Sequence, residues 1–278
     1  MFSSLCLVIF CVSGVLSAGL HFKYDRKPWL MGACKSTVRQ SPIVLSAQEE
    51  QCDARLEENV NLVGVKEELF VSMMNTGHSL QAVPTVGDEM RVVEIFVGEK
   101  KYVLKQFHFH WSGEDQHQGS EHKLDGNFGD AEMHFVFDQD KPTEGVRDTL
   151  AVLGVIIKAD SETDHEDFGR LFDVGLADLN VTSGKVNVTD GITVEDLLDG
   201  VDLARYYRYE GSLTTPPCSE MVAWTVLRDT VSISRAQLEQ LRSLPLIGTV
   251  GNHRKPTEPT PDHNLKVSCG GEEDDRKK

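Results

Sequence analysis

The residues best suited to chemistry begin at positions 106–111, which read Gln-Phe-His-Phe-His-Trp. Aromatic and polar residues alternate along this segment, as they do in a β-strand with one buried face. The period of two predicts that Gln106, His108 and His110 lie on the same face of the strand. Two imidazoles at positions i and i+2 of a strand can bind one metal ion without distortion of the backbone.

A second strand-like segment, residues 132–137, supplies a third histidine, His134. Three neutral histidines with an open fourth position form the ligand set of catalytic zinc sites, in which the metal lowers the pKa of bound water to about 7. A single strand histidine is more often an ordinary core or surface residue. Two histidine-bearing strands with the same local pattern favour the metal-binding interpretation, and we therefore predict a zinc centre.

Each of these strands also places a hydrogen-bonding side chain two residues before a histidine. A zinc-bound histidine usually donates its second ring N–H to a carboxylate, an amide oxygen or a backbone carbonyl, which fixes the ring orientation. Gln106 is therefore predicted to orient His108, and Glu132 to orient His134. No side chain is an obvious partner of His110, so a backbone carbonyl is the expected acceptor. The alternative interpretation is that Gln106 and Glu132 are ordinary half-exposed strand residues.

The composition is that of an acidic globular protein. The 278 residues include 28 Lys and Arg against 44 Asp and Glu, a formal net charge of −16. This balance argues against nucleic acid or an anionic membrane as a partner. The acidic residues are scattered and form no EF-hand-like motif, so a solvated surface is the default interpretation. Binding to carbonate mineral or extracellular matrix is a further role that this charge permits.

The N-terminal residues predict a secretory signal peptide at positions 1–18. Leu5–Val15 forms an apolar run of signal-peptide length that is too short to span a bilayer comfortably, and small residues follow it. A membrane anchor is the alternative. Two sequons, at Asn180 and Asn187, would be glycosylation acceptors in the same compartment. We therefore expect a secreted, extracellular protein without a membrane anchor.

Four cysteines follow the signal segment, namely Cys34, Cys52, Cys218 and Cys269. An even number in a secreted chain suggests two disulfide bonds, for which the sequence alone allows three pairings. Residues 268–278 are mostly polar and charged and are expected to form a disordered tail. No apolar stretch there resembles a membrane span or a lipid-anchor signal.

The elements that must position these residues are mostly short strands. Segments bounded by Gly, Asp, Asn and Pro predict strands at residues 68–73, 91–97, 102–111, 131–138, 151–158, 206–212 and 221–227. Helical patterns fall at residues 161–171, 193–198 and 234–243, with Thr193 and Ser234 as N-cap candidates. Residues 252–264, polar and rich in proline, are expected to form a surface strap. Many strands and few helices predict one mainly β (α+β) domain.

Five segments, in this order, resemble the alpha-class carbonic anhydrases: RQSPI at 39–43, QFHFHW at 106–111, GSEH at 119–122, EMH at 132–134 and YEGSLTTPPC at 209–218. The similarity runs from about Tyr24 to Val267, and the domain is placed at residues 19–267. It implies a large, twisted, mostly antiparallel β-sheet with a few short surface helices, and zinc at the base of a conical cavity. It also implies a zinc lyase that interconverts CO2 and bicarbonate through a zinc-bound hydroxide.

Carried over position by position, the resemblance implies that His108, His110 and His134 bind Zn²⁺. Thr214 would accept a hydrogen bond from the zinc-bound hydroxide and donate its own proton to Glu121, because an ionised carboxylate can only accept. The Thr214 backbone N–H would hold a substrate oxygen.

The resemblance assigns further roles at the rim and walls of the site. His78 matches a proton shuttle, for which an exposed imidazole with a pKa near 6.5 is suited; without the resemblance it would be an ordinary loop histidine. The substrate-facing residues would be Val136, Val152, Leu213, Thr214, Thr215 and Trp224. A Cys34–Cys218 disulfide would brace the Thr214 loop, whereas pairing Cys52 with Cys269 follows from parity alone. The chain departs from the family at residues 252–254, Asn-His-Arg, where Asn-Trp-Arg is common.

Two other classes of function compete with the enzyme. An inactive relative acting as a binding module is disfavoured, because such relatives lose zinc-ligand histidines and all three are present here. A structural component of a mineral matrix would rely on the acidic charge. Zinc content and CO2 hydration separate the enzyme from the binding module, and binding to carbonate mineral tests the matrix role.

Overall fold

The computed structural model describes residues 22–24, 29–46, 52–57, 59–85, 92–113, 118–140, 148–173, 176, 179, 184–249 and 251–270. The predicted signal peptide, the sequon at Asn180 and the part of the predicted tail after residue 270 lie outside these residues.

Strands dominate the described residues. In chain order they are β1 (Val44–Leu45), β2 (Asn61–Val63), β3 (Leu69–Asn75), β4 (Leu80–Pro84), β5 (Glu94–Val97), β6 (Lys100–Trp111), β7 (Lys123–Leu124), β8 (Ala131–Gln139), β9 (Leu150–Ser161), β10 (Lys185–Ile192), β11 (Tyr206–Gly211), β12 (Val222–Ser234) and β13 (Lys266–Val267). The helices are α2 (Glu166–Phe172), α3 (Val194–Leu197) and α4 (Arg235–Arg242), with 3-10 turns η2 (Gly32–Lys35) and η5 (Pro261–His263). A strand is present in each predicted segment, and the additional strands are β1, β2, β4, β7, β10 and β13.

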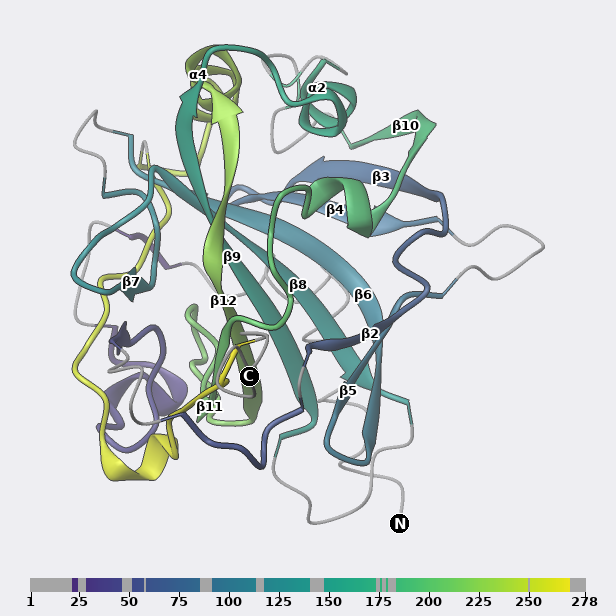
Figure 1. The fold of residues 1–278 in the computed structure, drawn as a ribbon. Coiled ribbons are helices and arrows are strands. Elements are labelled where there is room, and N and C mark those ends of the chain that lie inside the picture. The colour runs from purple at the N-terminus through teal and green to yellow at the C-terminus, as the bar shows by residue number, and fades with distance from the viewer. Residues whose placement is uncertain are drawn as a thin grey trace, which may run out of the picture.

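Within the described ranges, eleven strands form one twisted sheet (Figure 1). Its main path is β10-β3-β4-β6-β8-β9-β12-β11-β13, and β5 joins β6 and carries β2. The pairing of β9 with β12 is parallel, and the other pairings in this sheet are antiparallel. A separate parallel pair joins β1 to β7. The prediction of a mainly β fold around a mostly antiparallel sheet is confirmed.

Two of the three predicted helices begin at the caps that the sequence indicates. The Ser234 hydroxyl accepts a hydrogen bond from the Gln237 N–H at 3.1 Å, and the Gln237 side chain accepts one from the Ser234 N–H, which forms a capping box. The Thr193 hydroxyl caps α3 through the Asp196 N–H at 2.9 Å. Helix α2 begins at Glu166 rather than at 161, because β9 continues to Ser161 as the partner of Ser234.

Side-chain alternation along β6 divides the core between the two faces of the sheet. Phe107 and Phe109 are buried in the larger cluster, to which α2 and α4 contribute. These helices lie together at one end of the long central strands (Figure 1). Val136, Val152 and Trp224 belong to a second cluster. Because successive side chains point to opposite faces, His108 and His110 lie on the side of this second cluster.

Two disulfide bonds tie distant segments together. Cys34 pairs with Cys218, and Cys52 pairs with Cys269, as predicted. The first bond links η2 to the loop between β11 and β12. Ser268 is buried and donates a hydrogen bond from its hydroxyl to the Ala204 carbonyl at 2.6 Å, so the beginning of the predicted tail is part of the folded domain. None of the helices in the described ranges has the length and apolar character that a bilayer crossing requires.

Candidate metal centre

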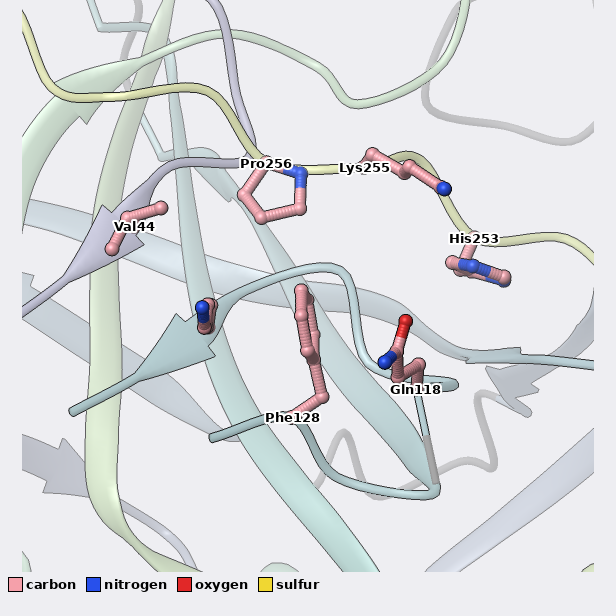
Figure 2. A pocket seen from close by; sticks show the side chains of 7 residues that line it. Val44, Gln118, Phe128, His253, Lys255 and Pro256 are labelled. Atoms are coloured by element: carbon pink, nitrogen blue, oxygen red, sulfur yellow. The ribbon is translucent and has the colours of Figure 1, made fainter. Parts of the chain in front are cut away.

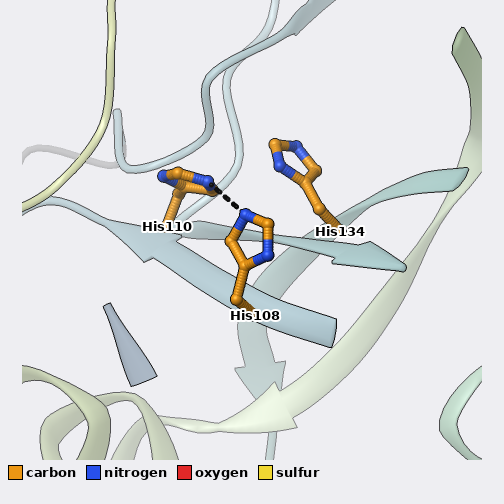
Figure 3. A group of neighbouring side chains, drawn as sticks. All are labelled: His108, His110 and His134. Carbon is orange, nitrogen blue, oxygen red and sulfur yellow. Dashed lines mark hydrogen bonds between the residues drawn. The ribbon is translucent and has the colours of Figure 1, made fainter. Parts of the chain in front are cut away.

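Adjacent strands bring the three predicted ligands together. His108 on β6 lies directly opposite His134 on β8, and His110 lies two residues farther along β6 (Figure 3). The ring centroids are 5.0 Å apart for His108 and His110, 5.3 Å for His108 and His134, and 4.7 Å for His110 and His134. One potential ligand atom from each residue lies within 4.8 Å of the others. The cluster can therefore hold one metal ion.

Each ring is oriented by one hydrogen bond. Gln106 Oε1 lies 2.9 Å from Nδ1 of His108, and Glu132 Oε1 lies 2.7 Å from Nε2 of His134. These are the contacts that the i−2 spacing predicts. The carbonyl acceptor expected for His110 is that of Asn252, 2.8 Å from Nδ1.

These bonds decide which ring nitrogens remain available. A ring nitrogen that donates to an oxygen carries the proton, so the opposite nitrogens of His108 and His110 keep their lone pairs. The two Nε2 atoms are only 3.1 Å apart (Figure 3), and two acceptors at that distance need a proton or a metal cation between them. Burial, followed by the neighbouring His110 and His134, lowers the pKa of His108 well below its ordinary value. Burial also lowers the pKa of His110, despite the opposing effect of Glu121. A proton is therefore disfavoured, and a metal cation fits the nitrogen donor set.

Glu132 is fully buried and accepts four hydrogen bonds. Its Oε1 accepts from His134 and, at 2.6 Å, from His122 Nδ1, while Oε2 accepts the backbone N–H groups of Glu121 and His122 at 2.8 and 2.7 Å. Burial alone would raise the pKa of Glu132, but the two histidines outweigh burial and hold it well below the ordinary value. Both oxygens of Glu132 are therefore occupied by hydrogen bonds. Glu132, His122 and His134 also lie close enough to hold a metal ion, but a carboxylate occupied in this way is poorly suited to binding one.

Two further residues, His122 and Gly154, contact the groups that orient His134, and the sequence alone did not identify either role. Nε2 of His122 lies 2.7 Å from the Tyr209 hydroxyl, which extends the buried network beyond Glu132. Gly154 lies directly opposite His134. A Cβ at Gly154 would lie 3.3 Å from Glu132 Oε1 and 3.6 Å from the His134 ring. Glycine therefore leaves room for the Glu132 and His134 side chains to pack against the β9 backbone. A glycine inside a strand is the sequence signal that could have drawn attention to it.

Glu121 lies beside the histidine cluster. Glu121 Oε1 accepts the Arg254 N–H at 2.7 Å and lies 3.5 Å from His110 Nδ1. Its Oε2 is buried, and among the described residues it has no hydrogen-bond partner. Thr214 is also buried, yet no hydrogen bond joins it to Glu121 in the described part of the chain. The predicted hydrogen bond from Thr214 to Glu121 is therefore absent from this structure, and Glu121 Oε2 remains available to accept it.

Four of the predicted substrate-facing residues belong to the second core cluster or pack against it. Val136, Val152 and Trp224 are buried in the second core cluster, with Leu213 packed against it. The Trp224 ring centroid lies 4.9 Å from that of His134. Thr215 is half-buried in the loop that follows Thr214.

The sequence predicts an exposed His78, but the residue is buried. Its side chain is 8% exposed and stacks on Phe22, with ring centroids 4.1 Å apart and planes 13° from parallel. The cause is an aromatic cluster of Phe22, Tyr24 and Trp29, which packs over the turn that carries His78. The expected exposure was wrong because this packing connects segments that are distant in sequence.

Residues 252–264 are more than the expected surface strap. Asn252 is fully buried, and its side chain donates to the carbonyls of His78 and Phe109 and accepts the Trp111 N–H. Only Phe107 and His108 of β6 pair with β4. The Asn252 amide provides hydrogen bonds for the next part of β6, at Phe109 and Trp111. Nδ1 of His253 lies 3.2 Å from the Trp111 carbonyl, so the residue at the family's usual tryptophan position still contacts β6.

Of the two sequons, only Asn187 can be placed. It is exposed on β10, the strand at one edge of the large sheet. This position is open to a glycan, and glycosylation remains a prediction.

Comparisons with known proteins agree with this geometry. A family model described as eukaryotic-type carbonic anhydrase matches residues 24–258. The chain is 40% identical over 162 residues to carbonic anhydrase 15 of Mus musculus, which covers 56% of this chain and 49%, about half, of that protein. It is 36% identical to carbonic anhydrase 6 of Mus musculus, covering 80% of this chain and 70% of that protein. The identity to carbonic anhydrase 6 of Bos taurus is 33%, covering 84% and 75%.

Proposed function

The chain belongs to the eukaryotic-type carbonic anhydrase family, a family of enzymes, and on that premise we propose that it catalyses the reversible hydration of CO2 to bicarbonate and a proton. We propose Zn²⁺ as the cofactor and His108, His110 and His134 as its ligands. The observation that supports this most strongly is the pair of Nε2 atoms of His108 and His110, which face each other at 3.1 Å. When bound there, zinc would supply the hydroxide that attacks CO2, because it lowers the pKa of a coordinated water to near 7.

The surrounding residues keep the three imidazoles in a binding orientation. Gln106, Glu132 and the Asn252 carbonyl each accept one ring N–H, which leaves the opposite nitrogen of each ring for the metal. Because these acceptors are fixed by strand pairing and burial, the rings need little rearrangement when the ion binds.

Thr214 and Glu121 are proposed to orient the nucleophile. The buried Oε2 of Glu121 can only accept, so a Thr214 hydroxyl turned toward it must donate its proton there. The Thr214 oxygen then keeps a lone pair for the hydrogen of the attacking group, and its backbone N–H holds a substrate oxygen. Val136, Val152, Leu213 and Trp224 are proposed as the apolar wall for CO2, with Thr215 beside it.

Each turnover also releases a proton, and we propose His78 as its carrier to buffer. Imidazole side chains in general can take up and release a proton near neutral pH. Because the ring lies under Phe22, relay to solvent requires the ring to turn outward or Phe22 to move.

We further propose a secreted protein with residues 19–267 as its catalytic domain. The two disulfide bonds support an oxidising compartment. Residues 1–18 as signal peptide and glycans at Asn180 and Asn187 complete this proposal. A role in mineral or matrix rests on the acidic composition alone.

Zinc content and stopped-flow CO2 hydration, measured on the same purified preparations, test the proposal. The wild-type protein should contain stoichiometric zinc and lose activity on chelation. His134→Ala should lose both together, whereas His165→Ala, which removes a histidine at the start of α2, should lose neither. Full zinc and full hydration in His134→Ala would refute the ligand assignment. Stoichiometric zinc without hydration in the wild type would favour the binding module.

A further inference from the structure

Seven residues line a pocket of about 280 Å³ (Figure 2). One wall consists of Val44, Gln118, Lys123 and Phe128. The last three come from residues 118–128, the segment that contains Glu121. The facing wall comes from His253, Lys255 and Pro256. The three proposed zinc ligands do not line it, so the pocket is separate from the metal centre.

The lining combines basic and apolar groups. Lys123 and Lys255 supply two ammonium groups, and no carboxylate lines the pocket. Within the described residues neither lysine forms an ion pair. The protein as a whole carries a formal net charge of −16, whereas the charged side chains that line this pocket are both positive. Unpaired ammonium groups beside a cavity favour an anionic ligand.

The apolar part of the lining has a defined arrangement. Lys123 Nζ lies 5.5 Å from the Phe128 ring centroid, a cation–π contact that holds the ammonium beside the ring. Lys123 on β7 is the direct partner of Val44 on β1, which fixes both in one wall. Pro256 faces Phe128 from the opposite wall (Figure 2). A ligand would therefore meet a charged group and an aromatic face together.

We propose that this pocket binds small carboxylates that carry an apolar or aromatic body, of about the size of benzoate. Its volume lies at the lower end of the range for small-molecule sites, which excludes most larger ligands. The carboxylate would contact one of the two lysines, and the body would pack between Phe128 and Pro256. This inference does not depend on the proposed catalytic function.

The two walls belong to segments that also support the metal centre. Glu121 lies between Gln118 and Lys123 in sequence, and Asn252 and Arg254 flank His253. The Arg254 N–H donates to Glu121 Oε1 at 2.7 Å and joins the two segments directly. A ligand in the pocket would bridge the same two segments and should raise the thermal stability of the protein.

Benzoate titrated into the full-length, zinc-loaded protein tests the site. Amide NMR shifts should saturate for residues 118–128 and 253–255. At least one of Lys123→Gln and Lys255→Gln should weaken benzoate binding about fivefold or more, since a partly exposed charge-assisted contact is lost. Lys185→Gln, the same change of charge on the distant edge strand β10, should leave the affinity unchanged. Benzamide, the neutral analogue, should bind at least about fivefold more weakly than benzoate.

Three results would each overturn the proposal. The first is benzoate shifts confined to the neighbours of His108, His110 and His134, which would place binding at the metal centre. The second is an unchanged affinity in both pocket-lysine variants whose melting temperatures match that of the wild type. The third is equal affinity for benzoate and benzamide, which would show that the lysines recognise no charge.

Discussion

Nδ1 of His110 donates a hydrogen bond to the backbone carbonyl of Asn252 at 2.8 Å, across 142 positions of the sequence. The Asn252 side chain at the same time contacts Trp111, Phe109 and His78. One buried residue therefore orients a proposed zinc ligand, completes the hydrogen bonding of β6 and fixes the backbone that carries the proposed proton carrier.

Asn252→Ala should damage stability and zinc binding together. The change removes three hydrogen bonds to buried backbone groups, although the Phe109 carbonyl keeps the Ser79 hydroxyl at 2.6 Å. We expect a loss of about 3 kcal/mol in the free energy of unfolding. Displacement of the carbonyl should weaken zinc binding roughly 10- to 100-fold. Urea denaturation and zinc competition measure the two effects, with exposed Asn61→Ala as the control. Normal zinc affinity in a folded Asn252→Ala protein would show that the carbonyl position does not depend on this side chain.

The two disulfide bonds should contribute similar stability but affect activity differently. The bonded cysteines are 184 and 217 positions apart, so the chain-entropy model assigns each bond up to about 5 kcal/mol. Replacing Cys34 and Cys218 by Ser should also lower kcat/KM for CO2 hydration, because this bond braces the loop that carries Thr214. The Cys52 and Cys269 double replacement is the matched control. An equal loss of kcat/KM in both double variants would argue against a specific effect on the Thr214 loop.

Local pattern was sufficient to predict the strands of the metal centre. Alternation of side chains depends on nearest neighbours, so it placed His108 and His110 on one face and correctly gave Gln106 as the i−2 partner of His108. The N-caps Ser234 and Thr193 are also local, because each bonds the backbone three residues ahead. Alternation alone could not pair His108 with His134, since that register depends on how two strands meet.

The features that were missed depend on contacts between distant segments. The burial of His78 depends on Phe22, more than fifty positions away, and nothing near His78 indicates it. The role of Asn252 was hidden in a segment whose prolines and polar residues suggested only a surface strap. The strand β4 is short and ends at Pro84, so its propensity is weak and its pairing with β3 and β6 determines it.

Thr214→Ala should separate metal binding from catalysis. Zinc content should stay normal because Thr214 binds no metal, whereas kcat/KM for CO2 should fall roughly 100-fold, since one preorganised hydrogen bond is lost. Thr214→Ser keeps the hydroxyl and is the matched control, with most activity retained. Unchanged kcat/KM in the alanine variant would remove Thr214 and its proposed bond to Glu121 Oε2 from the mechanism.

His78→Ala should slow proton release without changing CO2 chemistry. The step at the metal needs the nucleophile, the substrate and the Thr214 network, so kcat/KM should barely change. The maximal rate also requires proton export, so kcat in dilute buffer should fall by at least about tenfold. Concentrated imidazole-type buffers should restore it, because they replace the missing carrier.

The stacking of His78 on Phe22 gives this experiment a second arm. Phe22→Ala removes the ring that covers His78, so kcat in dilute buffer should rise if outward movement of His78 limits proton release. The double variant should behave like His78→Ala, since uncovering a carrier that is absent cannot help. An unaltered kcat in His78→Ala, or a loss that buffer does not rescue, would leave His78 as a packing partner of Phe22 and assign proton release to another route.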